Sequence, residues 1–420
     1  MELRNLSLIV LLGLWAPRAW SQAERLELQP LLDEALRNNR EILAAQKRLE
    51  ASRLRPTQAS SLPEPTFSLG YSSNGSPRPF AGLGVEPTAN AGFMVSQEFP
   101  FPGKRTLRGE VASKEADAEL QQYRAVQLSV VSRVKQAFHR LHHSYISVEA
   151  LERNRDLLNK FIRIAEARYS VGRAAQQDIF KAQAQLSIIE TRILKMQQDR
   201  SAAEAELNFL LNRPPDSPLA PPADVEPAEF KLTLEDLFAR ARESTPALQR
   251  EQKMIERAEL ALNLARKDYY PDYSLSAGYF NMGRMPAMYQ VRADFKLPAW
   301  FWRKQRAEVA EQAAGVSQAR HSYEAANQAL TFRLKNEYLM AQTSYRLMEI
   351  YSKTVVPQAS LALESSIPGY ETGAVDFLNL LTNFMTVLEY ELNYHEEALN
   401  YQLALARIEE LTGPPPEPQP

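Results

Sequence analysis

The chain has 420 residues, of which 45% are hydrophobic and 24% charged, and it contains no cysteine. This composition provides ample apolar material for a core, but it excludes disulfides, thiolate metal sites and a cysteine nucleophile. The 49 Lys and Arg residues nearly balance the 51 Asp and Glu residues, which leaves a net charge of −2. Nothing in this balance indicates a polyanionic partner, and we expect no nucleic acid to bind.

The N-terminus predicts export. Arg4 precedes an apolar run over 6–16, and small residues at Ala19 and Ser21 suit a cleavage site, so residues 1–21 are predicted to be a signal peptide. A buried N-terminal helix is the alternative interpretation. Export without cysteine favours the periplasm or outer membrane of a Gram-negative bacterium. No segment reaches the roughly 18–20 apolar residues of a spanning helix, so any membrane crossing would use strands.

The remainder consists of two copies of one unit. We expect a first repeat over 22–213, a Pro-rich linker over 214–230, a second repeat over 231–413 and a Pro-rich tail over 414–420. The correspondence is carried by matched residues in both copies: Leu28, Ala35 and Ile42 with Leu234, Ala241 and Leu248; Pro65 and Leu69 with Pro271 and Leu275; Arg133 and Tyr145 with Arg333 and Tyr345; and Leu211 and Pro214 with Leu411 and Pro414.

Long helices dominate both copies. Each unit is predicted to open with one helix, over 28–60 and 232–268, and to continue after two short strands into a very long helix. No Gly or Pro lies between Gly109 and Gly172, so a helix over 105–170 would be about 100 Å long. Turns over 169–177 and 369–376 lead into a closing helix of about 36 residues. Apolar steps of three and four favour coiled-coil packing.

Four short segments have a different period. The expected strands, 65–74, 90–99, 271–281 and 288–298, alternate between an apolar or aromatic face and a polar face. Such alternation is typical of transmembrane barrel strands, although a soluble half-buried hairpin produces the same pattern. About eight strands are the practical minimum for a barrel, and open edges are not tolerated in lipid. We therefore expect several chains to pool their strands.

This order of elements resembles the TolC-like outer-membrane efflux channels over essentially the whole mature chain. The run Phe99–Arg105, FPFPGKR, is similar to the members that serve heavy-metal pumps of the RND type. The resemblance implies a mainly α fold with membrane β: a homotrimer in outer-membrane lipid, with a 12-stranded barrel, four strands per chain, above a periplasmic helical tunnel.

The function that the resemblance implies is a passive exit duct for metal cations or small toxic compounds. It would dock onto a periplasmic adaptor protein and an inner-membrane RND-type pump, and it would need no cofactor. No enzyme motif of the P-loop, GxSxG or HExxH kind occurs, so we expect no catalysis. The alternative is a non-channel periplasmic adaptor or coiled-coil scaffold, distinguishable by outer-membrane fractionation and conductance.

The two predicted turns are similar to the helix-hairpin tips of that family. The resemblance implies a periplasmic aperture or gate there, formed by Asp376, Asn379, Glu371, Tyr370, Tyr169, Arg173 and Asp178. Threefold symmetry would set three Asp376 carboxylates around a narrow opening. A helix N-cap is the alternative role for Asp376 and Asp178. Two features depart from the family: the second tip is three residues shorter between Tyr and Asp, and the absence of cysteine excludes a lipid anchor.

Metal-binding candidates are weak. His139 and His143 are spaced to chelate one ion from a single helix, but no third ligand has a suitable spacing, so a surface or inter-helix role is the alternative. Met282, Met285 and Met288 could offer thioethers to Cu(I) or Ag(I) from a loop, where packing is the alternative explanation.

Overall fold

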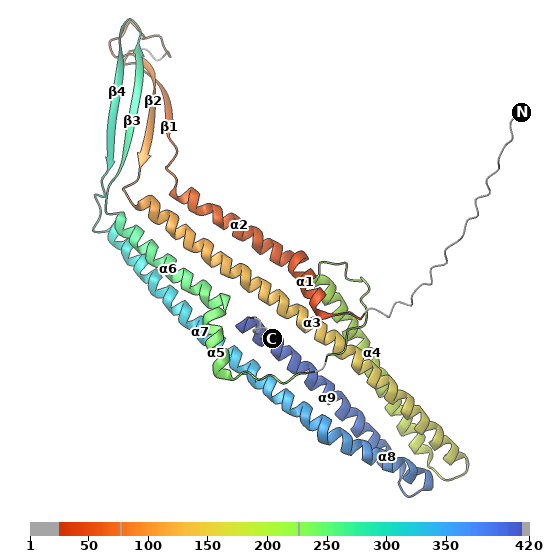
Figure 1. Cartoon of the computed structure of the whole chain (residues 1–420). Helices are drawn as coiled ribbons and strands as arrows, with labels where there is room; N and C mark the ends of the chain where they lie inside the picture. The colour runs from red at the N-terminus through yellow and green to blue at the C-terminus, as the bar shows by residue number, and fades with distance from the viewer. Residues whose placement is uncertain (1–24, 76–77, 226, 414–420) are drawn as a thin grey trace, which may run out of the picture.

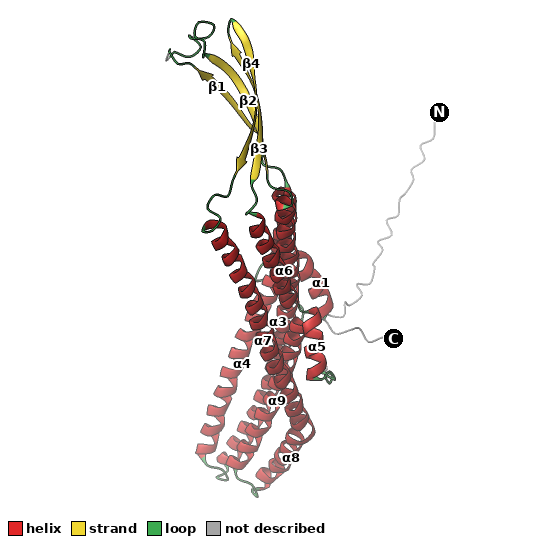
Figure 2. Cartoon of the chain, turned by 90° about the vertical axis from the view of Figure 1, so that its left-hand side faces the viewer, coloured by secondary structure: helices red, strands yellow, loops and turns green. Residues whose placement is uncertain are grey.

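The protein is an elongated molecule with a β-sheet at one end and long helices running away from it. A computed structural model describes residues 25–75, 78–225 and 227–413, and the predicted signal peptide, 1–21, and tail, 414–420, lie outside the described residues. Figures 1 and 2 show the sheet at one end and two helical hairpins at the other. Within the described residues, no helix is long and apolar enough to cross a membrane.

The four strands form one antiparallel sheet in chain order, β1-β2-β3-β4. They are β1 Thr66–Ser72, β2 Asn90–Phe99, β3 Asp272–Met282 and β4 Met285–Lys296. The register aligns Leu69, Phe93, Tyr279 and Tyr289 across all four strands on one face. Because alternate residues share a face, the predicted apolar stripes merge into one apolar surface. β1 and β4 are left as unpaired edges.

The methionine loop predicted from the sequence is instead a tight hairpin. Met282 ends β3, Met285 begins β4 and pairs with it, and Met288 lies within β4 opposite Phe280. Gly283 makes this possible, since its φ of 71° suits a two-residue turn that other residues enter with strain. The expectation of strand 288–298 therefore placed the start of β4 too late.

Each predicted first helix is broken in two. The first copy has α1 Leu28–Asn38 and α2 Arg40–Ser60, and the second has α5 Leu234–Ser244 and α6 Pro246–Lys267. The side chain of Asn39 accepts from the N–H groups of Glu41 and Ile42, which caps α2, and its Nδ2 donates to Leu210 O at 2.9 Å. At Thr245, the following Pro246 favours a new helix start. The apolar residues keep a helical spacing of 3.6 residues across both breaks, so the sequence pattern does not reveal where the helices are interrupted.

The long helices are α3 Lys104–Ser170 in the first copy and α7 Lys304–Ile350 in the second. α3 is 67 residues long, about 100 Å, and packs on α2, α4, α6 and α9. The second long helix is not uniform: α7 passes through a π-helical turn at Tyr351–Val355 into α8 Val356–Thr372. Pro357 explains the irregularity, because it lacks an N–H and crowds the preceding turn. The closing helices are α4 Gln176–Leu210 and α9 Phe377–Thr412.

The core repeats the duplication. Leu31, Ala35 and Ile42 are buried against α3 and α4 in one cluster. Their counterparts in the second copy, Leu237, Ala241 and Leu248, are buried against α7 and α9 in another. A third cluster joins the hairpins of both copies near their tips, with Phe161 of α3 edge-on to Phe384 of α9 at 5.7 Å. The predicted duplicated, mainly helical fold with four membrane-type strands is confirmed.

Candidate functional site

The candidate residues lie at the two hairpin tips, at the end of the molecule farthest from the sheet (Figure 1). The first tip joins α3 to α4 over residues 171–175, and the second joins α8 to α9 over residues 373–376. The buried cluster shared by α3, α4, α8 and α9 holds the two hairpins side by side. The structure thus brings together the residues selected from the sequence, although the two tips differ in construction.

The first tip is open and polar. Gly172 turns the chain with a φ of 71°, and its N–H donates to Tyr169 O at 2.9 Å. Tyr169 is 45% exposed, and Arg173 is also exposed. The N-cap of α4 is Ala175, and Asp178 is the third residue of the helix. The N-cap interpretation of Asp178 is therefore wrong; the carboxylate, half-buried, lies in the first turn, where the helix dipole favours a negative charge.

The second tip is tighter and capped. Gly373 turns the chain with a φ of 85°, and Ala374 N donates to Gly369 O at 2.8 Å. Asp376 is the N-cap of α9, and its Oδ1 accepts from the N–H of Asn379 at 2.9 Å. The N-cap interpretation of Asp376 is confirmed. Since one carboxylate oxygen is used by the cap and the residue is exposed, the remaining charge faces solvent. Glu371 and Asn379 are exposed beside it.

Tyr370 is buried, unlike Tyr169. Only 4% of its surface is exposed, and its ring packs on Phe377 with centroids 5.4 Å apart. The Arg168 guanidinium from the first hairpin lies over that ring, 4.6 Å from its centroid. Burial raises the pKa of Tyr370, against the opposing effect of the Arg168 charge. The two tyrosines, equivalent by sequence, therefore have different environments.

Arg168 was missed by sequence reasoning. It links the two tips: its Nη2 donates to Arg173 O at 3.5 Å while the guanidinium covers Tyr370. Among the residues that the structure describes, its Nε and Nη1 are buried without a hydrogen-bond partner, as is the Tyr370 hydroxyl. Comparison of the repeats offered a signal, because the residue before Tyr169 is Arg168 whereas the residue before Tyr370 is Gly369. Because the second copy has glycine at the equivalent position, an arginine here indicates a function that is specific to the first copy.

The predicted metal candidates are not assembled into a ligand set. His139 and His143 of α3 line a cavity of about 190 Å³ with His142 and with His395 of α9. Burial lowers the pKa of both His139 and His143 to about 4, so these rings are neutral near pH 7. Among the described residues, no group of three or more His, Asp or Glu is placed to hold a metal ion. The three methionines lie on the β3–β4 hairpin described above.

The sequence matches the outer membrane efflux protein family over 31–213 and 237–414, which covers both repeats and most of the chain. The chain belongs to this family. Membership places it in the outer membrane with a periplasmic extension and confirms the predicted function, an efflux channel rather than an enzyme. The adaptor or scaffold alternative is not supported. No curated protein sequence matches the chain.

Solved structures show the same fold. The outer-membrane channel OprN is 16% identical over 92% of this chain and 89% of its own, with a TM-score of 0.79. CusC, solved in a study of its folding and transmembrane channel formation, is 16% identical over 96% and 95%, with a TM-score of 0.78. The outer membrane protein VceC of Vibrio cholerae is 19% identical over 92% and 96%, with a TM-score of 0.77.

Proposed function

We propose that three copies of this channel close into one 12-stranded barrel. The observation that supports this most strongly is the sheet itself, which has four strands within the described residues, one face that is mainly apolar but interrupted at Gln97, and edges at β1 and β4 without a partner strand there. An edge exposed to lipid leaves backbone groups unsatisfied, each at a cost of several kcal/mol. Pairing β4 of one copy with β1 of the next satisfies both edges and forms a closed ring.

The helical part would then form a periplasmic tunnel. α3 extends about 100 Å, far enough to carry the hairpin tips well away from the membrane. Because the chain has no nucleotide-binding motif, energy must come from elsewhere. We assign this role to an inner-membrane pump of the RND type, joined through a periplasmic adaptor, with metal cations or small toxic compounds as substrates. The run Phe99–Arg105, which is similar to the members that serve heavy-metal pumps, makes metal cations the first substrates to test.

The tips would form the periplasmic aperture. Exposed Asp376, Glu371 and Asn379 on the second tip would face the axis, with Tyr169, Arg173 and Asp178 of the first tip beside them. Three copies of Asp376 would create a ring of negative charge that attracts cations and repels anions. Tyr370, buried under Arg168, would instead hold the second tip in shape.

Channel formation is tested by molar mass and conductance. Protein extracted from outer membranes should have three times the mass of one chain, and planar bilayers should show discrete, cation-selective openings. A cysteine pair engineered across β1 and β4 on the same face of the sheet, for example Phe67→Cys with Val291→Cys, should cross-link between chains. Val291 already lies opposite Ala277 of its own chain, so Ala277→Cys with Val291→Cys is the intrachain control. A monomer without conductance would contradict the proposal.

A further inference from the structure

The two repeats differ at the turns that lead from the sheet into the long helices. The first turn, residues 100–103, joins β2 to α3, and the second, residues 297–303, joins β4 to α7. They occupy equivalent places in the duplicated unit, at the helical end of the sheet (Figure 1). The side chains of the first turn pack against the protein, whereas those of the second turn are exposed, and this difference indicates what surrounds each turn.

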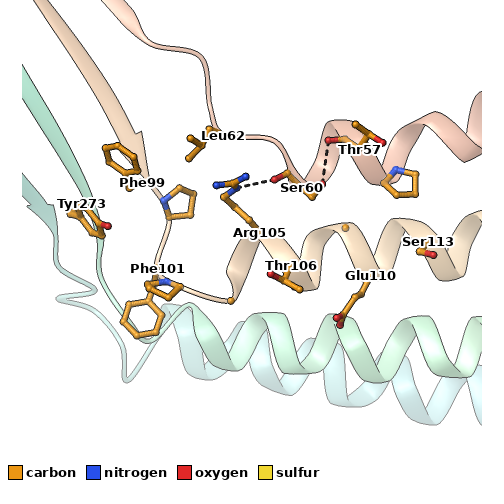
Figure 3. A pocket seen from close by; sticks show the side chains of 15 residues that line it. Thr57, Ser60, Leu62, Phe99, Phe101, Arg105, Thr106, Glu110, Ser113 and Tyr273 are labelled. Atoms are coloured by element: carbon orange, nitrogen blue, oxygen red, sulfur yellow. Dashed lines mark hydrogen bonds between the residues drawn. The ribbon is translucent and has the colours of Figure 1, made fainter.

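The first turn is fixed against the protein. Phe101 stacks on Tyr270 with centroids 4.5 Å apart, and its N–H donates to Asp272 Oδ1 at 2.7 Å. Lys104 is 2% exposed, and its Nζ contacts Asp272 at 2.9 Å and Asp268 at 3.1 Å. A cavity of about 760 Å³ lies beside this turn, between α2 and the start of α3 (Figure 3). Phe101 and Lys104 are therefore both engaged within the chain.

The second turn presents its aromatic groups outward. Trp300, Phe301 and Trp302 are 67%, 50% and 52% exposed. The rings contact one another, with Trp302 5.8 Å from Trp300 and 5.1 Å from Phe301 between centroids. Three exposed cations follow, at Arg303, Lys304 and Arg306. Such a cluster of large aromatic side chains in water is unfavourable unless another surface covers it.

Backbone hydrogen bonds fold this turn back on itself. The N–H groups of Arg303 and Lys304 both donate to Trp300 O, at 3.0 and 2.9 Å, and Arg306 N donates to Phe301 O at 3.1 Å. The exposed rings therefore project from a fixed frame. Their exposure is a property of the fold and does not arise from a poorly held loop.

The turn continues the apolar face of the sheet. Val291, Phe295 and Leu297 alternate down β4 and past its end, with exposures of 84%, 63% and 72%. At the same level Phe99, Tyr273 and Phe295 form a row of rings, with neighbouring centroids 5.5 and 6.4 Å apart. In an outer-membrane strand, such a row marks the boundary between hydrocarbon and headgroups. The second turn lies just beyond that boundary.

We propose that residues 297–306 bind phospholipid of the periplasmic leaflet. Trp300, Phe301 and Trp302 would lie at headgroup level, which suits amphipathic rings, and the three cations would attract anionic headgroups. A second copy of the chain fits less well, because the segment between α2 and the other edge strand, residues 61–65, offers a single carboxylate, Glu64, to three cations. This inference uses the outer-membrane location but is independent of the trimer and of the aperture.

Tryptophan fluorescence tests the proposal directly. The four tryptophans are Trp15, Trp20, Trp300 and Trp302, so after the predicted signal peptide only the second turn fluoresces as tryptophan. The purified protein is placed in vesicles of phosphatidylglycerol and phosphatidylcholine that carry bromine near the headgroup or near the chain end. Bromine near the headgroup should reduce the emission by about half, and deep bromine should reduce it less. Emission unaffected by either position would overturn the proposal, whether a second copy or water covers the rings.

A second probe separates this inference from the membrane location. With Trp300→Phe and Trp302→Phe as background, which also controls for any retained signal peptide, Val291→Trp places one tryptophan on the apolar face of β4. Deep bromine should quench it wherever the sheet lies in lipid. If Val291→Trp is quenched and the native pair is not, the inference fails and the location stands. If neither is quenched, the location itself fails.

The cations are tested by brominating one lipid at a time. Brominated phosphatidylglycerol should quench the native pair severalfold more than brominated phosphatidylcholine at equal content, because the anionic lipid is enriched near the turn. Replacing Arg303, Lys304 and Arg306 by Gln should bring this ratio close to one. Arg284→Gln, an exposed cation on the hairpin at the far end of the sheet, should leave it unchanged. Equal quenching by the two brominated lipids in the native protein would show that the cations do not attract anionic lipid.

Discussion

The two hairpin tips begin from the same repeated sequence and reach different structures. At the first tip Tyr169 is half-exposed and the helix start has no side-chain cap. At the second, Tyr370 is buried under Arg168 of the first tip, and Asp376 caps α9. Arg168 of the first hairpin thus covers the tyrosine of the second tip, whereas Tyr169 stays half-exposed. After duplication, one copy can therefore supply a packing residue, Arg168, while the other forms a constrained turn with an exposed charge at Asp376.

Truncating the two tyrosines should separate the tips most clearly. Tyr370→Ala removes a buried ring and its contacts with Phe377 and Arg168, and should destabilise the second tip by about 3–5 kcal/mol. Tyr169→Ala, the matched control, should change local stability by less than about 1 kcal/mol. Hydrogen exchange of the amides over 369–377 and 168–176 measures both. Equal losses of protection in the two variants would show that the tips are supported alike.

Acid should weaken the middle of the molecule before it affects the tips. His139 and His143 have folded pKa values of about 4, below the ordinary 6.5, because burial disfavours the charged ring. Between these values the unfolded chain binds more protons, so stability falls as pH drops from about 6.5 towards 4. At pH 5 the loss should be on the order of 2 kcal/mol per histidine.

The measurement is the unfolding midpoint in detergent between pH 7 and pH 4.5. Replacing both His139 and His143 by Gln should flatten the pH dependence of the midpoint, while His321→Gln, at an exposed site on α7, should not. Exchange at the tips should change little across the same range. A pH dependence unaltered in the double variant would contradict the assignment to these rings.

A smaller effect is expected from the Tyr370 hydroxyl alone. This hydroxyl is buried without a hydrogen-bond partner in the described structure, which is unfavourable. Tyr370→Phe should therefore stabilise the second tip by about 1 kcal/mol, and Tyr169→Phe should have no measurable effect. Hydrogen exchange of the amides over 369–377 and 168–176 measures both effects. Destabilisation by Tyr370→Phe would indicate that the hydroxyl gains a partner, such as a neighbouring chain, in the assembled channel.

Replacing Asp376 separates its charge from its capping role. Asp376→Asn retains an N-cap of similar quality and should leave tip stability almost unchanged, while Asp376→Ala should lose about 1 kcal/mol. If the proposed ring exists, both variants should weaken block by multivalent cations about tenfold in single-channel recordings. Asp178→Asn, half-buried on the first tip, should weaken block less. Unchanged block in Asp376→Asn would remove the ring and leave the cap as the role of this residue.

Much of this molecule could be predicted from the pattern of its residues. The duplication, the long helices and the strand faces were accessible because each depends on local periodicity and on matched positions such as Leu28 and Leu234. The breaks at Asn39 and Thr245 were not, since the apolar period continues through them. The methionines were placed in a loop because a two-residue turn at Gly283 leaves only a weak signal in the sequence.

The sequence located the candidate site at the two tips, but it did not predict how the two tips differ. Tyr169 and Tyr370 are paired by position, and the local difference beside them is Arg168 in one copy and Gly369 in the other. Each N-cap follows its tyrosine by six residues, so Asp376 takes the place of Ala175, and Asp178 lies three residues further along, in the first turn of α4. Arg168 contacts Tyr370 only because the two hairpins pack together, a contact between residues far apart in the chain.

The sequence by itself determined that this chain is a duplicated, mainly helical protein with four alternating strands, because helical and strand periods are local properties of the chain. Tertiary structure alone decided which tyrosine is buried and which strand-to-helix turn exposes its aromatic rings. The physical reason is that each of these outcomes depends on contacts between the two copies. Packing α3 against α9, and one hairpin against the other, gives equivalent residues unequal surroundings.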